Sequence, residues 1–206
     1  MIRALEPDEI SLAAKTLAAS FDDDPLFCYM LPKPGQRRRW LDLIMTAALT
    51  AGFPEGHVVT TDDGPGGGAM AVIPPGRYPL PSSRLRRAVF RARMLRTLVT
   101  PTYRLLRGGI GMLDAMETMH ITEPHYYLQV IGVHPEAKGR GIGGALVRHV
   151  VALADTDTAP VYLETSNQVN LGFYRRFGFE VVEEFRCPGG GPMNWTMMRP
   201  AAEPSW

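Results

Sequence analysis

The spacing of apolar and polar positions is clearest in the second half of the chain. Residues 126–133 (YYLQVIGV) are nearly all apolar or aromatic, which is typical of a strand buried on both faces. Apolar positions at helical spacing then predict a helix over 141–154. The rest of the pattern predicts, in order, a strand at 160–165, a helix at 167–177 and strands at 179–185 and 193–198. The predicted order of this half is therefore β-α-β-α-β-β.

The first half carries a weaker pattern. A short apolar run predicts a strand at 2–5, and apolar residues at helical spacing predict helices at 8–20 and 36–50. Two more strand patterns, separated by a turn sequence at 62–66, predict a hairpin formed by 57–61 and 69–73. The segment 75–123 interrupts this order.

The interrupting segment is basic and helix-prone. Nine arginines lie between 77 and 107, and no Asp or Glu occurs between 64 and 113. Apolar residues fall on one side of the predicted helices, so we interpret 75–123 as a helical insertion between the third and fourth strands that docks on the domain. We expect residues 1–200 to form a single domain and 201–206 to form a tail.

Composition narrows the class of protein. The chain has 206 residues, 45% of them hydrophobic, and a formal net charge of +1, which favours a domain with a real core and gives no reason to expect a nucleic-acid partner. The cysteines, Cys28 and Cys187, have no zinc-ligand spacing, so we expect ordinary thiols and no metal. Neither a secretory signal nor a membrane-spanning run is evident, which predicts a cytoplasmic protein without a membrane partner.

A glycine-rich turn, KGRGIGG at 138–144, joins the buried strand to the first helix of the second half. Backbone N–H groups at the start of a helix bind anions, and glycines let phosphate oxygens come close to the main chain. Two basic side chains add positive charge. We therefore predict a phosphate or pyrophosphate site formed by Lys138, Gly139, Arg140, Gly141, Ile142, Gly143 and Gly144.

A dinucleotide site is one alternative for this turn. Gly139, Gly141 and Gly144 match G-x-G-x-x-G, and Glu164 follows at a strand end where a ribose-binding acid belongs. However, residues 134–138 separate the strand from the first glycine, and too few residues follow for a long alternating domain. An NAD(P)-binding oxidoreductase stays open as an alternative.

The same residues resemble the GCN5-related N-acetyltransferase (GNAT) superfamily. Its acetyl-CoA loop, [Q/R]-x-x-G-x-[G/A], is matched by residues 138–143, with Lys138 in place of Gln or Arg. Its second signature, N-x-x-[A/N]-x-x-[F/L]-Y-x-x-x-G-F, is matched by Asn167, Asn170, Phe173, Tyr174, Gly178 and Phe179. The resemblance covers 125–199, and LETSNQVNLGFYRRFGFEV at 163–181 is similar to puromycin N-acetyltransferase-like proteins.

This resemblance implies an α/β fold whose mixed, mostly antiparallel, splayed sheet is flanked by helices. It also implies acetyl-CoA as co-substrate and direct attack by an amine. Backbone groups of Ile131, Gly132 and Val133 would hold the pantetheine, and Gly132 suits a bulge or a close backbone approach.

Two side chains are the candidate catalytic groups by the same resemblance. Tyr174 would protonate the departing thiolate, and Glu164 would accept the amine proton through water. Asn167 and Asn170 are candidate CoA contacts, although Asn167 could equally cap the helix, in competition with Ser166.

The acceptor is not fixed by these signatures. We expect a small-molecule amine, antibiotic-like in type, and a monomer or homodimer. Protein N-terminal or lysine acetylation and a non-catalytic acyl-CoA sensor are the alternatives. The acidic triplet 22–24 either attracts a cationic amine or forms a solvated turn.

Overall fold

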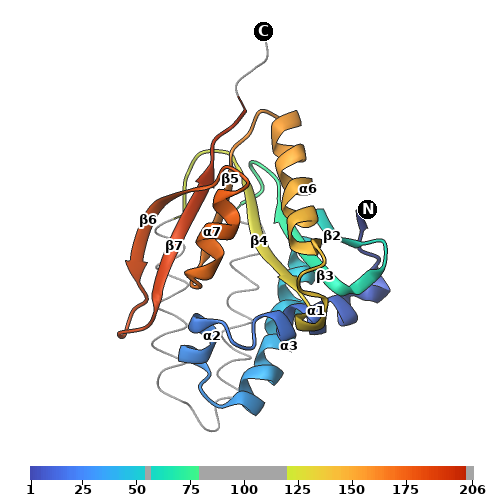
Figure 1. Ribbon diagram of the computed structural model, residues 1–206, viewed down its shortest axis with the longest axis vertical. Coiled ribbons are helices and arrows are strands. Elements are labelled where there is room, and N and C mark those ends of the chain that lie inside the picture. The colour runs from blue at the N-terminus through green and yellow to red at the C-terminus, as the bar shows by residue number, and fades with distance from the viewer. Residues whose placement is uncertain (54–56, 79–119, 203–206) are drawn as a thin grey trace.

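The described residues form an α/β structure around a seven-stranded sheet. A computed structural model of the chain describes residues 1–53, 57–78 and 120–202; most of the predicted insertion, 79–119, lies outside them. The strands are β1 (Ile2–Ala4), β2 (His57–Thr61), β3 (Gly64–Ile73), β4 (Tyr126–Val133), β5 (Val161–Thr165), β6 (Glu180–Arg186) and β7 (Met193–Arg199). Their spatial order is β1-β2-β3-β4-β5-β7-β6, and every neighbouring pair is antiparallel except β4 with β5 (Figure 1).

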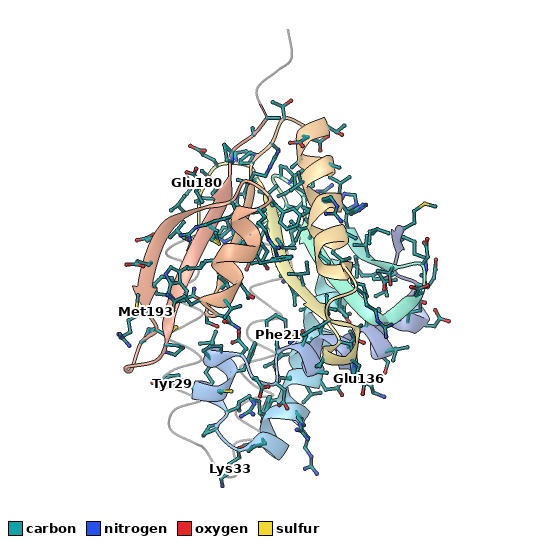
Figure 2. The ribbon with its side chains drawn as sticks, in the orientation of Figure 1. Phe21, Tyr29, Lys33, Glu136, Glu180 and Met193 are labelled. Atoms are coloured by element: carbon teal, nitrogen blue, oxygen red, sulfur yellow. The ribbon has the colours of Figure 1, made fainter. Side chains whose placement is uncertain are left out.

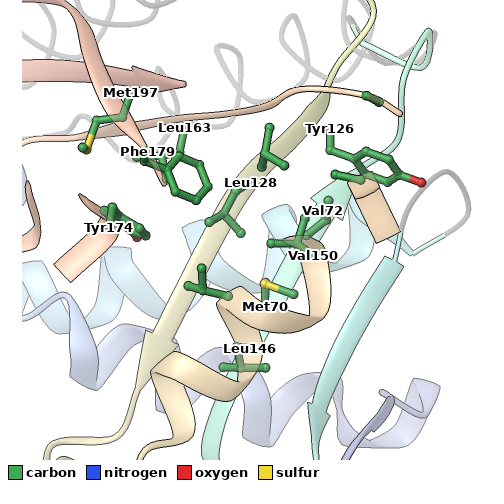
Figure 3. Close-up of a cluster of buried hydrophobic side chains, with 14 of the residues drawn as sticks. Met70, Val72, Tyr126, Leu128, Leu146, Val150, Leu163, Tyr174, Phe179 and Met197 are labelled. Atoms are coloured by element: carbon green, nitrogen blue, oxygen red, sulfur yellow. The ribbon is translucent and has the colours of Figure 1, made fainter. Parts of the chain in front are cut away.

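Helices cover both faces of this sheet. The described helices are α1 (Ile10–Ser20), α2 (Pro25–Met30), α3 (Pro34–Gly52), α6 (Ile142–Thr156) and α7 (Val169–Arg175), with short 3-10 turns at Pro7–Glu9 and Pro135–Ala137. On one face, α6 and α7 pack over a core that includes Tyr126, Leu128 and Leu163 (Figure 3). On the other face, α1 and α3 cover Ala69, Ala71 and Val130. The predicted mixed, mostly antiparallel sheet flanked by helices is confirmed.

The central strands separate soon after they meet. β4 and β5 pair only at Tyr126 with Val161 and at Tyr127 with Tyr162. Beyond these pairs the two strands diverge (Figure 1). The splay leaves the β5-facing edge of β4 without a strand partner among the described residues.

The bulge and the close approach in β4 are two separate features. The register between β3 and β4 shifts so that Ala71 pairs with Val130 and Val72 with Leu128, which leaves Gln129 as the extra residue. Gly132 is instead the point where α1 touches the strand, because a Cβ there would lie 2.1 Å from Oγ of Ser20. Of the two roles predicted for Gly132, the close approach is correct.

Two local predictions were wrong. No helix was predicted at 25–30, but Asp24 caps α2: its Oδ1 accepts hydrogen bonds from the N–H groups of Leu26 (3.0 Å) and Phe27 (3.3 Å), and Pro25 occupies the first helical position. The predicted turn at 62–66 is shorter, since β3 already begins at Gly64. No described helix is both long enough and apolar enough to cross a bilayer.

Candidate active site

The glycine-rich turn is held in a conformation that suits glycine. Gly139 (φ +81°) and Gly141 (φ +78°) both lie in the left-handed region, which is strained for residues with a Cβ. Gly141 is the N-cap of α6, and the first helical hydrogen bond runs from the N–H of Ala145 to the carbonyl of Gly141 (3.0 Å). The preceding N–H groups of this first turn, including those of Gly143 and Gly144, therefore have no partner within the helix.

The space in front of this turn suits an anion. No atom lies within 4 Å of the position where a Cβ of Gly139 or Gly141 would be. The side chains of Lys138 and Arg140 are exposed beside it. Open space, partial positive charge from the helix N-terminus and two cations fit the pyrophosphate of acetyl-CoA.

Packing on β3 fixes the position of the turn. A Cβ on Gly68 would lie 2.8 Å from Cγ2 of Ile142 and 3.0 Å from the carbonyl oxygen of Gly132. The missing side chain therefore allows the first turn of α6 to lie directly on the sheet. The side chain of Ile142 packs on β3, while its backbone belongs to the glycine-rich turn.

The predicted pantetheine segment lies along the splay. Ile131, Gly132 and Val133 pair with the β3 segment 68–70 on one side. Their other edge faces the widening gap toward β5, because the β4–β5 pairing ends at Tyr127. This arrangement leaves backbone groups of the segment available for a strand-like ligand.

Tyr174 lies in the last turn of α7, at the core face of the sheet. Its side chain is buried near Phe179 (Figure 3), with the two ring centroids 5.6 Å apart. The ring centroid of Phe173 lies 5.2 Å away. Burial raises the pKa of Tyr174 well above its ordinary value. The hydroxyl therefore keeps its proton at neutral pH, as a general acid must.

Glu164 lies on the opposite face of the sheet from Tyr174. Leu163, its neighbour on β5, belongs to the core around Tyr174, and successive strand residues point to opposite faces. The Glu164 side chain is only 5% exposed and lies among aromatic rings. Burial, followed by the charge of Glu164, raises the pKa of both Tyr127 and Tyr162. Glu164 is therefore enclosed on this face.

His120, near the end of the insertion, contacts Glu164, and His125, just after the insertion, contacts His120. Nδ1 of His120 lies 3.5 Å from Oε1 of Glu164, and Nε2 of His120 lies 3.0 Å from Nε2 of His125. Sequence reasoning missed His120, since no periodicity or motif marks it. Among the described residues no group of three or more His, Cys, Asp or Glu side chains is placed to hold a metal ion.

The asparagines order the turn between β5 and α7. Oγ1 of Thr165 accepts hydrogen bonds from the N–H of Asn167 (3.3 Å) and from Nδ2 of Asn170 (3.1 Å). Oδ1 of Asn167 accepts from the N–H of Val169 (3.1 Å), near the start of α7. Ser166 does not cap this helix, because its hydroxyl donates to Asp24 (2.9 Å).

Most of the acidic triplet is bound within the protein. Asp22 pairs with Arg37 (3.3 Å) and Arg38 (2.9 Å), and Asp24 accepts hydrogen bonds from Ser166 and from the first turn of α2. Burial raises the pKa of Asp24. These carboxylates therefore position α2, and the exposed Asp23 is the one of the three with its side chain in solvent.

Comparison with known proteins finds acetyltransferases that are similar to part of the chain. Residues 89–181 match the family model of the acetyltransferase (GNAT) domain. The chain is also similar to the N-alpha-acetyltransferase RimI of Mycobacterium tuberculosis, with 33% identity over 84 residues. That match covers 39% of this chain and 52% of RimI, so the chain spans about half the length of this curated relative.

Solved structures share the fold. The crystal structure of "histone acetyltransferase HPA2 and related acetyltransferase" from Corynebacterium glutamicum superposes with a TM-score of 0.72 at 19% identity, covering 100% of this chain and 98% of that one. A polyamine N-acetyltransferase of Drosophila melanogaster gives a TM-score of 0.60 at 16% identity, covering 96% and 98%. The family match thus lies within residues 89–181, and the fold of the described residues is that of solved GNAT acetyltransferases.

Proposed function

We propose that the protein is an N-acetyltransferase that transfers the acetyl group of acetyl-CoA to a primary amine of a small molecule. The observation that supports this most directly is the splay after Tyr127, which leaves one edge of β4 open beside the anion-binding turn at 138–144. A pyrophosphate at the turn would place the rest of the same ligand along that edge.

Acetyl-CoA supplies a thioester carbonyl for direct attack by the amine. The turn at 138–144 binds and orients it, and an N–H of the segment 131–133 donates to the carbonyl oxygen as negative charge develops there. Holding both reactants in one site lowers the barrier by several kcal/mol, about 7–11 at best in well-oriented model reactions.

Proton transfers are assigned to two groups on opposite faces. Tyr174 donates its hydroxyl proton to the departing sulfur, which its raised pKa permits because the proton is present at neutral pH. Glu164 accepts a proton from the amine, directly or through water. We assign no chemical role to Asn167 or Asn170 beyond ordering the turn.

The names of two structural relatives supply the first acceptors to test. One is a polyamine N-acetyltransferase that forms N-acetylagmatine, and another is an agmatine N-acetyltransferase. Small aliphatic amines of this kind, with puromycin-like amines beside them, are therefore the first acceptors to test.

Protein N-terminal acetylation is the second candidate. The observation in its favour is the 33% identity to the N-alpha-acetyltransferase RimI. A peptide that begins with alanine distinguishes the two candidates, because a small-molecule enzyme would acetylate agmatine or puromycin and leave the peptide unmodified.

The test combines ligand binding with turnover. Acetyl-CoA should raise the melting temperature, whereas NAD(P) should leave it unchanged; ligand at a hundredfold excess over its Kd stabilises by about 2.7 kcal/mol. Tyr174→Phe should keep this shift and lose about 10²–10⁴-fold in CoA release with an accepted amine. Gly172→Ala is a matched control in the same helix, since no atom lies within 4 Å of the added methyl group. Stabilisation by NAD(P) alone would support an oxidoreductase, and full activity of Tyr174→Phe would remove the role of the tyrosine.

A further inference from the structure

A chain of buried nitrogen and oxygen atoms leads from the end of the insertion to Glu164. Nδ1 of His125 lies 2.6 Å from the carbonyl oxygen of Glu123. Nε2 of His125 faces Nε2 of His120 at 3.0 Å, and Nδ1 of His120 faces Oε1 of Glu164 at 3.5 Å. The side chains of His120 and Glu164 are 4% and 5% exposed, so water cannot replace missing partners freely.

The backbone carbonyl determines where the protons lie. A carbonyl oxygen only accepts, so Nδ1 of His125 carries the hydrogen. Burial lowers the pKa of His125, which keeps its ring neutral and leaves Nε2 as an acceptor. Nε2 of His120 must then be the donor in the 3.0 Å contact. In a neutral His120 the remaining nitrogen, Nδ1, therefore has a free lone pair.

That lone pair points at another acceptor. Oε1 of Glu164 and Nδ1 of His120 are both buried without a hydrogen-bond partner among the described residues. Two facing acceptors in a poorly solvated site repel each other, whereas one added proton would join them by a charge-assisted hydrogen bond. A single proton between Nδ1 of His120 and Oε1 of Glu164 would complete the hydrogen-bonded chain.

We infer that His120 and Glu164 together form the proton-accepting unit of the enzyme, with His125 fixing the tautomer of His120. This inference rests on the proposed acetyl transfer. Glu164, two residues beyond the last β4–β5 pair on β5, receives the proton, and His120 shares it. His120 and His125 are thus positioning residues that act through Glu164.

The proton balance is simple. An ammonium acceptor loses one N–H proton to Glu164, and the free amine attacks the thioester. The proton is then shared between Oε1 of Glu164 and Nδ1 of His120. The carboxylate and the imidazolium together carry no net charge. Tyr174 gives its hydroxyl proton to the departing sulfur, and the second amine proton, lost as the amide forms, passes to the Tyr174 phenolate and restores it. The stored proton leaves to solvent after the products.

Aromatic rings enclose the shared proton. Tyr78 stacks on His120 with ring centroids 3.8 Å apart, and Tyr127 and Tyr162 each lie 4.8 Å from it. Together with His125 and Glu164, these are the titratable groups that face His120 from the described elements. Such an enclosure strengthens the attraction between an imidazolium and a carboxylate.

The tautomers can be tested without any turnover. In protein labelled with ¹⁵N-histidine, NMR at pH 8 should show hydrogen on Nδ1 of His125 and on Nε2 of His120. Glu164→Gln should change the ring ¹⁵N chemical shifts of His120 and should leave those of exposed His57 unchanged. Hydrogen on Nδ1 of His120, or His120 ring shifts indifferent to Glu164→Gln, would overturn the inference.

Kinetics provide the second test. His120→Phe retains a ring to stack on Tyr78 but cannot hold a proton, so kcat/KM at pH 7 should fall about 10²-fold or more. The shape of the pH profile should change as well, because Glu164 no longer shares the proton with an imidazole. His57→Phe is the control. If the wild-type protein transfers no acetyl group, the proposed function is refuted, while the NMR result is unaffected. An active, folded His120→Phe variant with wild-type rate and profile would refute only this inference.

Discussion

Gly132→Ala tests the contact that seats α1 against the central strand. A Cβ at this position would lie 2.1 Å from Oγ of Ser20, 2.9 Å from Cδ2 of Leu17 and 3.0 Å from Cβ of Ser20. Overpacking of this kind costs about 1–3 kcal/mol. Alanine also lowers the conformational entropy of the unfolded chain relative to glycine, which offsets about 0.4–1 kcal/mol of this cost. The net destabilisation is therefore about 1–2 kcal/mol, which for a domain of this length lowers the melting temperature by roughly 2–8 °C.

Urea denaturation of five proteins would measure this effect: wild type, the three single variants Gly132→Ala, Gly172→Ala and Ser20→Ala, and the double variant Ser20→Ala/Gly132→Ala. Gly172→Ala, which adds the same methyl group where no atom lies within 4 Å, should be neutral or stabilising. Ser20→Ala removes the hydroxyl in the shortest contact, so Gly132→Ala should cost less in that background than alone. If Gly132→Ala is no worse than Gly172→Ala, or if Ser20→Ala gives no relief, the close packing of α1 on β4 is wrong.

Three further predictions concern the anion-binding turn, the first strand and α2. Gly141→Ala places a Cβ at φ +78°, so it should cost about 1–2 kcal/mol in stability and weaken acetyl-CoA binding in calorimetric titration. Hydrogen bonds from Arg3 hold the pKa of Glu9 at about 2, so the stability this pair contributes is complete above the ordinary value of 4.5 and is lost as the pH falls toward 2. Thermal melts of wild type and Glu9→Gln should therefore converge over that range. Tyr29→Phe, which removes the 2.7 Å hydrogen bond to the carbonyl of Gly189, should lower stability by about 0.5–1.5 kcal/mol in urea titration.

Periodicity and turn chemistry predicted most of the described framework. Residues 57–61 were predicted as a strand with the bounds that β2 has, and the strand predicted at 126–133 is β4. These segments carry dense local signals: apolar runs bounded by turn residues. The order of elements after β4 was predicted for the same reason.

In two places the sequence carried a local signal, but another feature of the sequence led to a different prediction. Asp24 followed by Pro25 is a regular helix start, yet the helix it begins is only six residues long and has no room for periodicity. The turn was predicted to run to Gly66 and the strand to begin only at residue 69, after Gly67 and Gly68, because glycine is rare in strands. Their place in β3 is explained by α6, since Ile142 lies where side chains of Gly67 and Gly68 would be.

The histidine cluster had no local signal at all. His120 and Glu164 are distant in sequence and meet only because β4 and β5 pair at Tyr127 and Tyr162. Glu164 was predicted as a base on its strand position, but its histidine partner depends on how the end of the insertion folds back. Contacts of this kind arise from the tertiary structure, and the spacing of residues along a single sequence does not indicate them.

The short β4–β5 pairing also has a mechanical consequence. Two residue pairs join the N-terminal four strands to the C-terminal three, so this is the line along which the sheet is least cross-linked. Farther along the gap, α2 links the two parts: Asp24 accepts from Ser166, and Tyr29 reaches the carbonyl of Gly189 after β6 (Figure 2). The two parts of the sheet are therefore connected at one end of the gap by the β4–β5 pairs and at the other end by the contacts of α2. Sub-global opening along this line would be visible as early hydrogen exchange in β5–β7. A ligand that binds in the gap would contact both parts of the sheet and slow this exchange.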